Sequence, residues 1–309
     1  MTAIANWQPV DSTDFRSDAP AMPIRTSQAL SAALAFLATS TAHAQTLSTD
    51  TLSPDSAQQP KWEAGVAGVA LTVPDYPAAD ENRTLALPAP YFIYHGTTFR
   101  SDDEGSRLRQ KLTPNVELSL SGGGALSSDS SHSDARRGMP DLGYLVEVGP
   151  NLRLVFDGPR PKSKWVIDLP LRAVSSLKDF DLRWRGMIVA PEFAFQSKHF
   201  LDQRMDLRVA LGAEIGSTLL QRYFYDVQPQ YVTPDRTQYS ASAGYLASSL
   251  AATVNYRFTK KLRGFVSLEY DNYAGAANTE SPLYRANDGY SAVIGCSWSF
   301  LQSREFAEE

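Results

Sequence analysis

Apolar and polar residues alternate one by one along many segments of the chain between Trp62 and Phe300. A repeat of two residues is the period of a β-strand with two different faces, whereas an α-helix would repeat every three to four residues. The segment 205–215 shows the pattern most clearly. One of its faces carries Met205, Leu207, Val209, Leu211, Ala213 and Ile215, and the other carries Asp206, Arg208, Ala210, Gly212 and Glu214. The pattern therefore predicts an all-β protein.

The alternating segments define the predicted strands and their number. We predict strands at 62–73, 84–94, 99–110, 115–124, 142–157, 164–175, 180–196, 205–217, 245–258, 262–272 and 290–300. Single-chain bacterial barrels have an even number of strands, so in a barrel this set of eleven would need one change. Either 99–110, which Asp102-Asp-Glu104 interrupts, is not a separate strand, or a twelfth strand lies between Leu219 and Tyr225. We favour twelve.

Two architectures accommodate strands with one apolar and one polar face: a soluble sandwich and a membrane barrel. Long strands, Gly and Ser among the polar positions, and aromatic residues near strand ends favour the barrel, because aromatic rings prefer the membrane–water boundary. These aromatic residues are Trp62, Tyr91, Tyr94, Trp165, Trp184, Tyr256, Phe258, Tyr270, Trp298 and Phe300. We predict an antiparallel transmembrane β-barrel of the outer-membrane type with about 12 strands (10–12).

The connections between the predicted strands are of two kinds. Those at 125–141, 218–244 and 273–289 are long and rich in Pro, Gly, Ser and Asp, whereas those at 259–261 and 197–203 are short. Outer-membrane barrels have long outward-facing loops and short periplasmic turns. We therefore expect the long connections to face outward and the short ones to face the periplasm.

The amino-terminal region has the features of a secretory signal. Met22-Pro-Ile-Arg25 gives a basic start, 29–38 is mostly apolar, and Thr41-Ala-His-Ala44 offers small residues for cleavage. The apolar stretch is too short to span a bilayer, and three aspartates in 1–21 do not suit a signal, so we expect translation to start at Met22. The predicted organisation is 1–21 not translated, 22–44 signal peptide, 45–61 flexible leader, 62–300 barrel and 301–309 polar carboxyl-terminal tail. The expected location is the outer membrane of a Gram-negative bacterium.

Charge and cysteine content narrow the classes of partner. The formal net charge of -5 gives no excess of positive charge to neutralise a phosphate backbone, so we expect no nucleic-acid partner. The single cysteine, Cys296, excludes an intramolecular disulfide and a thiolate-rich metal site. It falls in phase with Ile294 and Trp298 on the apolar face of 290–300, where it serves as a small hydrophobe. This segment, which ends in Trp298 and Phe300, is the predicted closing strand of the barrel.

A series of short motifs in a fixed order resembles the MipA/OmpV family of outer-membrane proteins, over essentially the whole mature chain. The motifs are Asp75-Tyr-Pro77, Asp80-Glu81 with Arg83, Leu87-Pro-Ala-Pro-Tyr91, 135–142, Glu147-Val-Gly149, Tyr223-Phe-Tyr-Asp226, 239–245 and Ser281-Pro-Leu283. The positions carried by the resemblance are Tyr76, Pro77, Asp80, Arg83, Pro88, Pro90, Gly138, Asp141, Glu147, Gly149, Tyr239, Gly244, Tyr245, Ser281 and Pro282.

The resemblance has two departures. Ala78 stands where the family has a glycine after Tyr-Pro, and the chain continues beyond the terminal aromatic Phe300. The resemblance implies an outer-membrane barrel and, as partners besides outer-membrane lipid, a lytic transglycosylase and a murein synthase that the barrel would link as a scaffold. Other members of the family have been treated as porin-like.

Candidate chemistry is sparse in the mature chain. His95, His132 and His199 lie in predicted turns or loops without the spacing of a metal site. The loop 127–134 contains Ser, His and Asp, the residue types of a lipid-modifying barrel enzyme, but neighbours in one loop are not held in an attack geometry. We therefore expect no catalysis, no metal and no cofactor.

Charged residues on the polar faces are predicted to point into the lumen. Paired charges fill and wet the interior of a small barrel, and charge rings can also select solutes. The candidates are Asp102, Glu104, Arg107, Arg109, Asp168, Arg172, Arg208, Glu214, Arg257 and Glu269. We expect a non-catalytic envelope scaffold for murein-remodelling enzymes. The alternatives are a narrow porin-like channel for small solutes and, third, a lipid-modifying enzyme.

Overall fold

The computed structural model describes residues 61–95, 99–102 and 105–303. The segments 1–21 and 22–44, the leader 45–61 except its last residue, Glu104, and 304–309 of the tail lie outside the described residues. In the described part of the chain, the alternating segments form one antiparallel sheet of thirteen strands. Strands are the main elements, as the repeat of two residues predicts. No helix among these residues has the length and apolar character needed to cross a membrane.

The strands follow one another along the chain, with one short helix near the middle. They are β1 (Trp62–Pro74), β2 (Asn82–His95), β3 (Phe99–Asp102), β4 (Gly105–Thr113), β5 (Val116–Ala125), β6 (Tyr144–Asp157), β7 (Ser163–Lys178), β8 (Asp181–Val189), β9 (Glu192–Ser197), β10 (Met205–Gly216), β11 (Gly244–Arg257), β12 (Leu262–Asn272) and β13 (Asp288–Gln302). Helix α2 (Thr218–Tyr225) and the 3-10 turn η2 (Pro229–Tyr231) precede β11.

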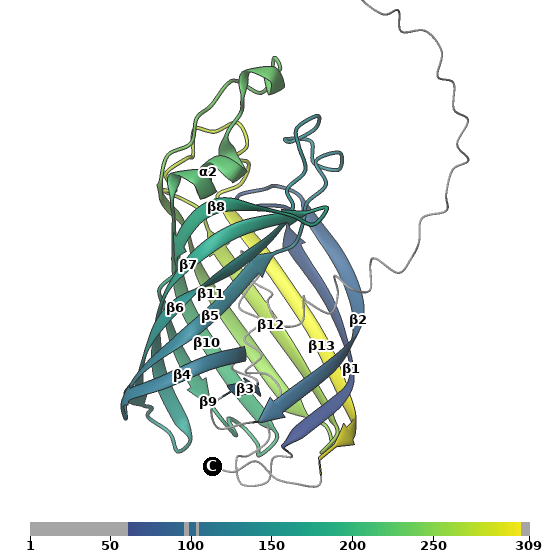
Figure 1. The fold of residues 1–309 in the computed structure, drawn as a ribbon, viewed down its shortest axis with the longest axis vertical. Coiled ribbons are helices and arrows are strands. Elements are labelled where there is room, and N and C mark those ends of the chain that lie inside the picture. Colours follow the sequence, from purple (N-terminus) through teal and green to yellow (C-terminus); the bar gives the residue numbers. More distant parts are fainter. Residues whose placement is uncertain (1–60, 96–98, 103–104, 304–309) are drawn as a thin grey trace, which may run out of the picture.

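The sheet closes into a ring. Apart from β8 and β9, which do not pair with each other, each strand pairs with its neighbour along the chain. β13 returns to pair with β1, where Trp298 lies opposite Val66. β8 and β9 are one strand broken at Ala190-Pro191, because proline has no N–H for the ladder, and both pair with β7 and β10. Thirteen strands therefore fill twelve positions in the ring, which is the predicted transmembrane barrel (Figure 1).

Three local predictions were wrong. The segment 180–196, predicted as one strand, is the two strands β8 and β9. The interrupted segment 99–110 is two strands, β3 and β4, and Asp102 pairs with Gly105 across the hairpin, as Asp and Gly favour turns. No strand lies between Leu219 and Tyr225, because this segment is helix α2. Leu220 and Phe224 are four residues apart, so they share one face of a helix, and both are buried.

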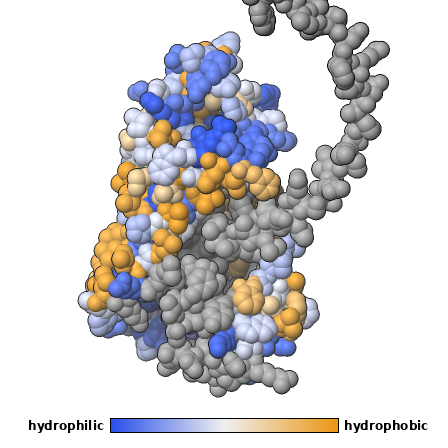
Figure 2. Space-filling model, viewed as in Figure 1, coloured by the Kyte–Doolittle hydropathy of each residue, from blue (hydrophilic) through white to orange (hydrophobic). Residues whose placement is uncertain are grey.

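β13 shows how the two faces of the barrel differ. Its outward residues Tyr290, Ile294 and Trp298 are 61%, 58% and 53% exposed, whereas the inward serines and Val293 between them are buried. Phe300 and Cys296 also face outward. β13 is thus the closing strand predicted from the sequence, although it continues two residues past Phe300. Figure 2 shows the hydrophobic residues gathered over the strands.

The two ends of the barrel differ in their connections. The long-loop end consists of 75–81, 126–143, 179–180, 217–243 and 273–287, and lies at the top of Figure 1 with α2. The short-turn end consists of 114–115, 158–162, 198–204 and 258–261. The ion pairs and hydrogen bonds that could serve a function lie in the lumen and at the long-loop end.

Candidate functional site

A buried ion pair joins β6 and β7 inside the barrel. Arg153 and Asp168 lie opposite each other in register. The Arg153 guanidinium donates from Nε to Oδ1 at 2.9 Å and from Nη2 to Oδ2 at 3.0 Å. The Asn151 amide adds a third hydrogen bond to Oδ1 at 2.7 Å. Such a bidentate pair fixes both side chains in place.

Three further pairs follow around the lumen. Arg172 of β7 lies 3.3 Å from Glu147 of β6, and Arg208 of β10 pairs with Glu192 of β9. Near the short-turn end, Arg263 Nη1 lies 2.9 Å from Oε1 of Glu63, which is fully buried, so the pair ties β12 to β1 over the intervening strand β13. The two members of each pair neutralise one another, from neighbouring strands or, for Arg263 with Glu63, from strands on either side of β13. Breaking one such buried pair leaves the other charge uncompensated.

The structure places the predicted lumen charges as follows. Asp168, Arg172 and Arg208 belong to these pairs, and Glu214 and Glu269 lie on inward faces of β10 and β12. Arg257 lies at the short-turn rim, where it donates to the carbonyl of Gln203. Asp102, Arg107 and Arg109 belong to β3 and β4, but their side chains are not described.

Sequence reasoning predicted one lumen charge in three of these four pairs and neither member of the fourth, Arg263 with Glu63. The missed residues are Glu63, Glu147, Arg153, Glu192 and Arg263. A usable signal was present, because Arg263 falls in phase with Ser267 and Glu269 on the polar face of its strand. Pairing Arg153 with Asp168 also requires the register between β6 and β7, which a single sequence does not fix.

One side of the lumen is apolar. Leu71 and Val73 of β1 and Val293 of β13 form a buried cluster, with Leu85 and Phe265 packed against it. Gly295 makes room for this packing, because a Cβ at this position would lie 2.3 Å from Cε1 of Phe265. The interior therefore has an apolar wall at β13, β1 and β2, besides the ion pairs.

The connections of the long-loop end fold over the barrel as a cap with its own core. We call the cap the segments 75–81, 126–143, 217–243 and 273–287. Its buried core, which includes the ends of adjoining strands, consists of Tyr76, Ala79, Leu142, Leu145, Val174, Ile188, Leu220, Phe224, Tyr225, Val227, Ala241, Leu246 and Leu283. All four segments contribute to this core. They therefore pack on one another as a folded unit.

Tyr225 at the end of α2 ties three cap segments together. Its hydroxyl donates to the carbonyl of Pro77 at 3.1 Å, and its own carbonyl accepts from the Ser281 hydroxyl at 2.8 Å. Burial raises the pKa of the Tyr225 phenol well above its usual value, so the group stays a neutral donor. This fixes the first turn, α2 and the last cap segment to one another.

Two buried arginines bind backbone carbonyls between cap segments. Arg136 donates to the carbonyl of Phe224 at 3.0 Å and to that of Pro140 at 3.2 Å. Arg236 donates to the carbonyls of Ala135 and Arg137 at 2.9 and 3.1 Å. Because these donors bind carbonyls of other loop residues, they stabilise the cap.

Asn278 connects the last cap segment to α2 and to the residues that precede β11. Its amide donates to Oε1 of Gln221 at 3.0 Å, and its oxygen accepts from the Ser242 N–H and the Tyr239 hydroxyl. Asn278 is itself 1% exposed. A buried amide with this many partners holds a single orientation.

The first turn accommodates the alanine that departs from the family pattern. Ala78 takes φ 59, a left-handed conformation that favours glycine. It is fully buried, and its carbonyl accepts from the N–H groups of Arg285 and Ala286 at 2.8 and 3.0 Å. The surrounding hydrogen bonds therefore hold the turn in the conformation that a glycine would adopt with less strain.

Most positions carried by the resemblance meet in the cap. The positions of Tyr76, Pro77, Tyr239 and Ser281 in the cap are described above. Asp80 lies 3.3 Å from Arg285, and Asp141 lies 2.8 Å from Lys178. Arg83 donates to the Leu126 carbonyl at 3.1 Å, and the Tyr245 hydroxyl donates to the Asn272 carbonyl at 3.3 Å. Gly138 and Gly244 take positive φ, and Pro282 follows Ser281. Glu147 and Gly149 lie in β6, and Pro88 and Pro90 in β2. Motifs far apart in sequence thus assemble one structural unit.

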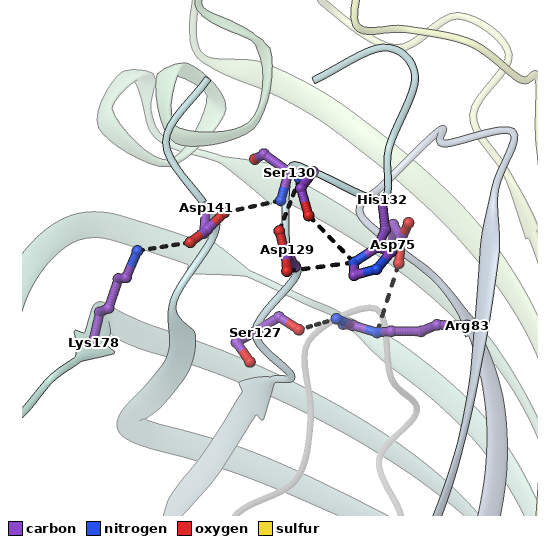
Figure 3. Close-up of polar contacts among 9 residues, drawn as sticks. Asp75, Arg83, Ser127, Asp129, Ser130, His132, Asp141 and Lys178 are labelled. Atoms are coloured by element: carbon purple, nitrogen blue, oxygen red, sulfur yellow. Dashed lines mark hydrogen bonds and ion pairs between the residues drawn. The ribbon is translucent and has the colours of Figure 1, made fainter. Parts of the chain in front are cut away.

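Polar contacts surround the 126–143 segment (Figure 3). Arg83 Nε lies 3.8 Å from Oδ1 of Asp75, and burial raises the pKa of the Asp75 carboxyl more than this cation lowers it. Asp141 accepts from Lys178 at 2.8 Å and from the Ser130 N–H at 3.0 Å. These hydrogen bonds, the one from Lys178 first, lower the pKa of the Asp141 carboxyl.

The Ser, His and Asp of the loop do not form a catalytic relay. Ser131 Oγ lies 3.5 Å from Nδ1 of His132, and Asp129 Oδ2 lies 3.3 Å from the same nitrogen. A relay needs the base to contact the nucleophile and the orienting carboxylate through different ring nitrogens. His132 is also 82% exposed. Within the described part of the chain, no group of His, Cys, Asp and Glu has the arrangement of a metal site.

Comparison with known proteins gives a family and a fold. The family model described as MltA-interacting protein MipA matches residues 66–300. No curated protein matches the sequence. An outer membrane channel from Pseudomonas putida F1 is similar at 13% identity and TM-score 0.40, covering 81% of this chain and 100% of its own. Outer membrane phospholipase A from Escherichia coli is similar at 10% identity and TM-score 0.30, covering 76% and 92%. Similarities this low carry no inference about activity.

Proposed function

The chain belongs to the MltA-interacting protein MipA family, and on that premise we propose that it is a non-catalytic scaffold in the outer membrane of a Gram-negative bacterium. The scaffold would bind murein-remodelling enzymes, in the first place a lytic transglycosylase and then a murein synthase. The family description, which names a protein interaction, supports a binding role. The two ends of the barrel would have separate tasks.

The cap is the observation that carries this proposal. Its four segments form a buried core over one end of the barrel and are joined by Tyr225, Arg136 and Asn278. A covered long-loop end favours a protein that binds partners over one that passes solutes. Murein lies in the periplasm, so the partner would contact the short-turn end, which faces the periplasm in barrels of this type.

The polar groups of the described residues support a role without catalysis. The lumen pairs Arg153 with Asp168 and Arg263 with Glu63 hold four of the inward charged groups in ion pairs, where each charge has a fixed partner. The Ser131, His132 and Asp129 contacts lack the geometry of a relay. The chain would therefore contribute position and affinity, and the bound enzymes would contribute the chemistry.

A direct binding measurement tests the scaffold. The detergent-solubilised protein is immobilised, and association of a purified murein lytic transglycosylase is recorded by biolayer interferometry. We expect saturable binding, and we expect K260E/K261E at the short-turn end to slow association, because charge steers encounter. The matched variant D235K/E280K reverses two charges on exposed residues of the cap and should bind like the wild type. No binding by the wild type, or an equal loss in both variants, would contradict the proposal.

A narrow channel for small solutes is the second candidate. Leu87 occupies an inward position of β2, opposite Val69, and yet is 43% exposed. This observation favours space inside the barrel near the apolar wall. Swelling of liposomes loaded with the protein, measured with sugars of increasing size, would support the channel if small sugars enter faster than in empty liposomes.

A further inference from the structure

Two turns at the short-turn end are joined into one surface. The Lys198 N–H donates to the carbonyl of Lys162 at 3.0 Å, which links the β6–β7 turn to the β9–β10 turn. The Lys162 amino group lies 3.3 Å from Nδ1 of His199, and the Arg160 guanidinium lies 4.9 Å from the centre of the Phe200 ring. The contacts hold the two turns in a fixed relation.

This joined surface concentrates positive charge. Arg160, Lys162 and Lys198 are exposed in a chain whose formal net charge is -5. The nearby carboxylates Asp202 and Asp206 accept from the backbone N–H groups of Arg204 and His199. Within the described residues, neither Arg160 nor Lys198 forms an ion pair with a carboxylate. Like charges held side by side fit an anionic ligand.

An aromatic row lies directly beneath these cations on the outer face of the barrel. Phe156, Trp165 and Phe195 lie opposite one another in register on β6, β7 and β9. Trp165 also stacks on Phe193 with ring centres 5.0 Å apart and planes 4° apart. Aromatic rings of this kind mark the membrane–water boundary.

The distance between the cations of the joined turns and the aromatic row matches the dimensions of one phospholipid molecule. Lys162 lies three positions before Trp165. Because a strand rises about 3.3 Å per residue, the cations lie roughly 10 Å or less beyond the rings. That is the depth of lipid phosphates next to the aromatic belt. We propose that the joined turns and the aromatic row form a binding site for an anionic phospholipid of the periplasmic leaflet, with its phosphate on Arg160, Lys162 and Lys198 and an acyl chain along Trp165 and Phe193.

Native mass spectrometry of the protein released from nanodiscs tests this site. The nanodiscs contain phosphatidylcholine with an equal share of phosphatidylglycerol. The wild type should retain phosphatidylglycerol in preference to phosphatidylcholine. K162Q/K198Q should lower the retained phosphatidylglycerol at least about tenfold, because it removes two of the three cations that bind the phosphate.

K260Q/K261Q is the matched control, because it removes two charges from another turn of the same end. It should retain phosphatidylglycerol like the wild type. An equal loss in both variants would indicate diffuse attraction and overturn the site. No preference for phosphatidylglycerol in the wild type would overturn it as well. Displacement by soluble glycerol phosphate would overturn the assignment to a lipid. Heat-modifiable gel mobility verifies that each variant is folded.

Discussion

The connections at the long-loop end carry ten acidic and five basic residues, whereas those described at the short-turn end carry one acidic and six basic residues. The first set forms a cap with a buried core. The second set consists of short turns whose cations are mostly exposed. The same strands therefore support two surfaces of opposite charge and different construction.

This difference shows that barrel and cap are held by different interactions. The barrel wall depends on the strand ladder and on ion pairs between neighbouring strands, as in Arg153 with Asp168. The cap depends on side chains that satisfy the carbonyls of distant loops, as in Arg136 and Tyr225. Variants should therefore open the cap and leave the barrel intact.

Arg136→Ala should have the largest effect on the cap. It removes two hydrogen bonds from a buried cation and leaves the carbonyls of Phe224 and Pro140 without these donors. We expect a loss of about 3 kcal/mol in cap stability. Hydrogen exchange of the α2 amides and protease cleavage within 126–143 measure the opening. Unchanged heat-modifiable mobility would confirm an intact barrel, and loss of the barrel as well would break the distinction between the two ends.

Tyr225→Phe should have a smaller effect of the same kind. It removes the hydrogen bond to the carbonyl of Pro77 and keeps the ring in the core. The expected cost is about 1 kcal/mol, read from the same α2 amides. Tyr290→Phe changes an outward tyrosine of β13 that lies outside the cap core, so it should leave α2 protection unchanged. If the α2 amides exchange at the same rate in the wild type and in Tyr225→Phe, the Tyr225 hydroxyl does not stabilise the cap.

Phe180→Gly should stabilise the protein slightly. Asp179 and Phe180 form the two-residue turn between β7 and β8, and both take positive φ, at 51 and 63. Such a turn favours Asp-Gly, and Phe180 is 86% exposed, so little packing is lost. We expect a gain of about 0.5 kcal/mol in urea unfolding. A loss of stability would indicate that Phe180 has a contact that its exposure does not reveal.

Asp141 should give the smallest effect, one that depends on pH. Because its hydrogen bonds lower its pKa below 3.8, the contribution of the Lys178 contact is present above this pH and is lost as the pH falls through the folded value. The pair is exposed, so the contribution is about 0.5 kcal/mol or less. Burial raises the pKa of Asp75, whose protonation at low pH favours the fold instead.

The Asp141 effect is therefore the difference between the wild type and Asp141→Asn. Proteolysis of the 126–143 segment from pH 7 to pH 3 measures it. The wild type should lose protection relative to Asp141→Asn only in the acidic part of this range. A constant difference across the range would assign the contact a role that does not depend on charge.

The sequence predicts the barrel better than the cap. Alternation in 205–215 and 290–300 identifies strands, their outward faces and the closing strand, because lipid and lumen impose a repeat of two residues on each strand. The cap has no such repeat. Leu220 and Phe224 predict a helix only once the buried face of the cap is known. The contacts of Arg136 and Asn278 join residues far apart in sequence, which no local pattern reveals.

The polar groups of the lumen are less predictable from the sequence than the strands and more predictable than the cap. The inward phase of Asp168 and Arg208 follows from alternation. Their partners Arg153 and Glu192 depend on the register between strands, which a single sequence does not fix. The interruption at Ala190-Pro191 follows from the missing N–H of proline, but its consequence, two strands in one position of the ring, requires the pairing.

Current through a planar bilayer tests the central claim, that the cap closes the long-loop end, most directly. We predict that the wild-type protein gives no stable current steps and that Arg136→Ala, with its cap loosened, gives frequent openings at the same applied voltage. Stable steps of uniform size in the wild type would contradict the account and favour a channel.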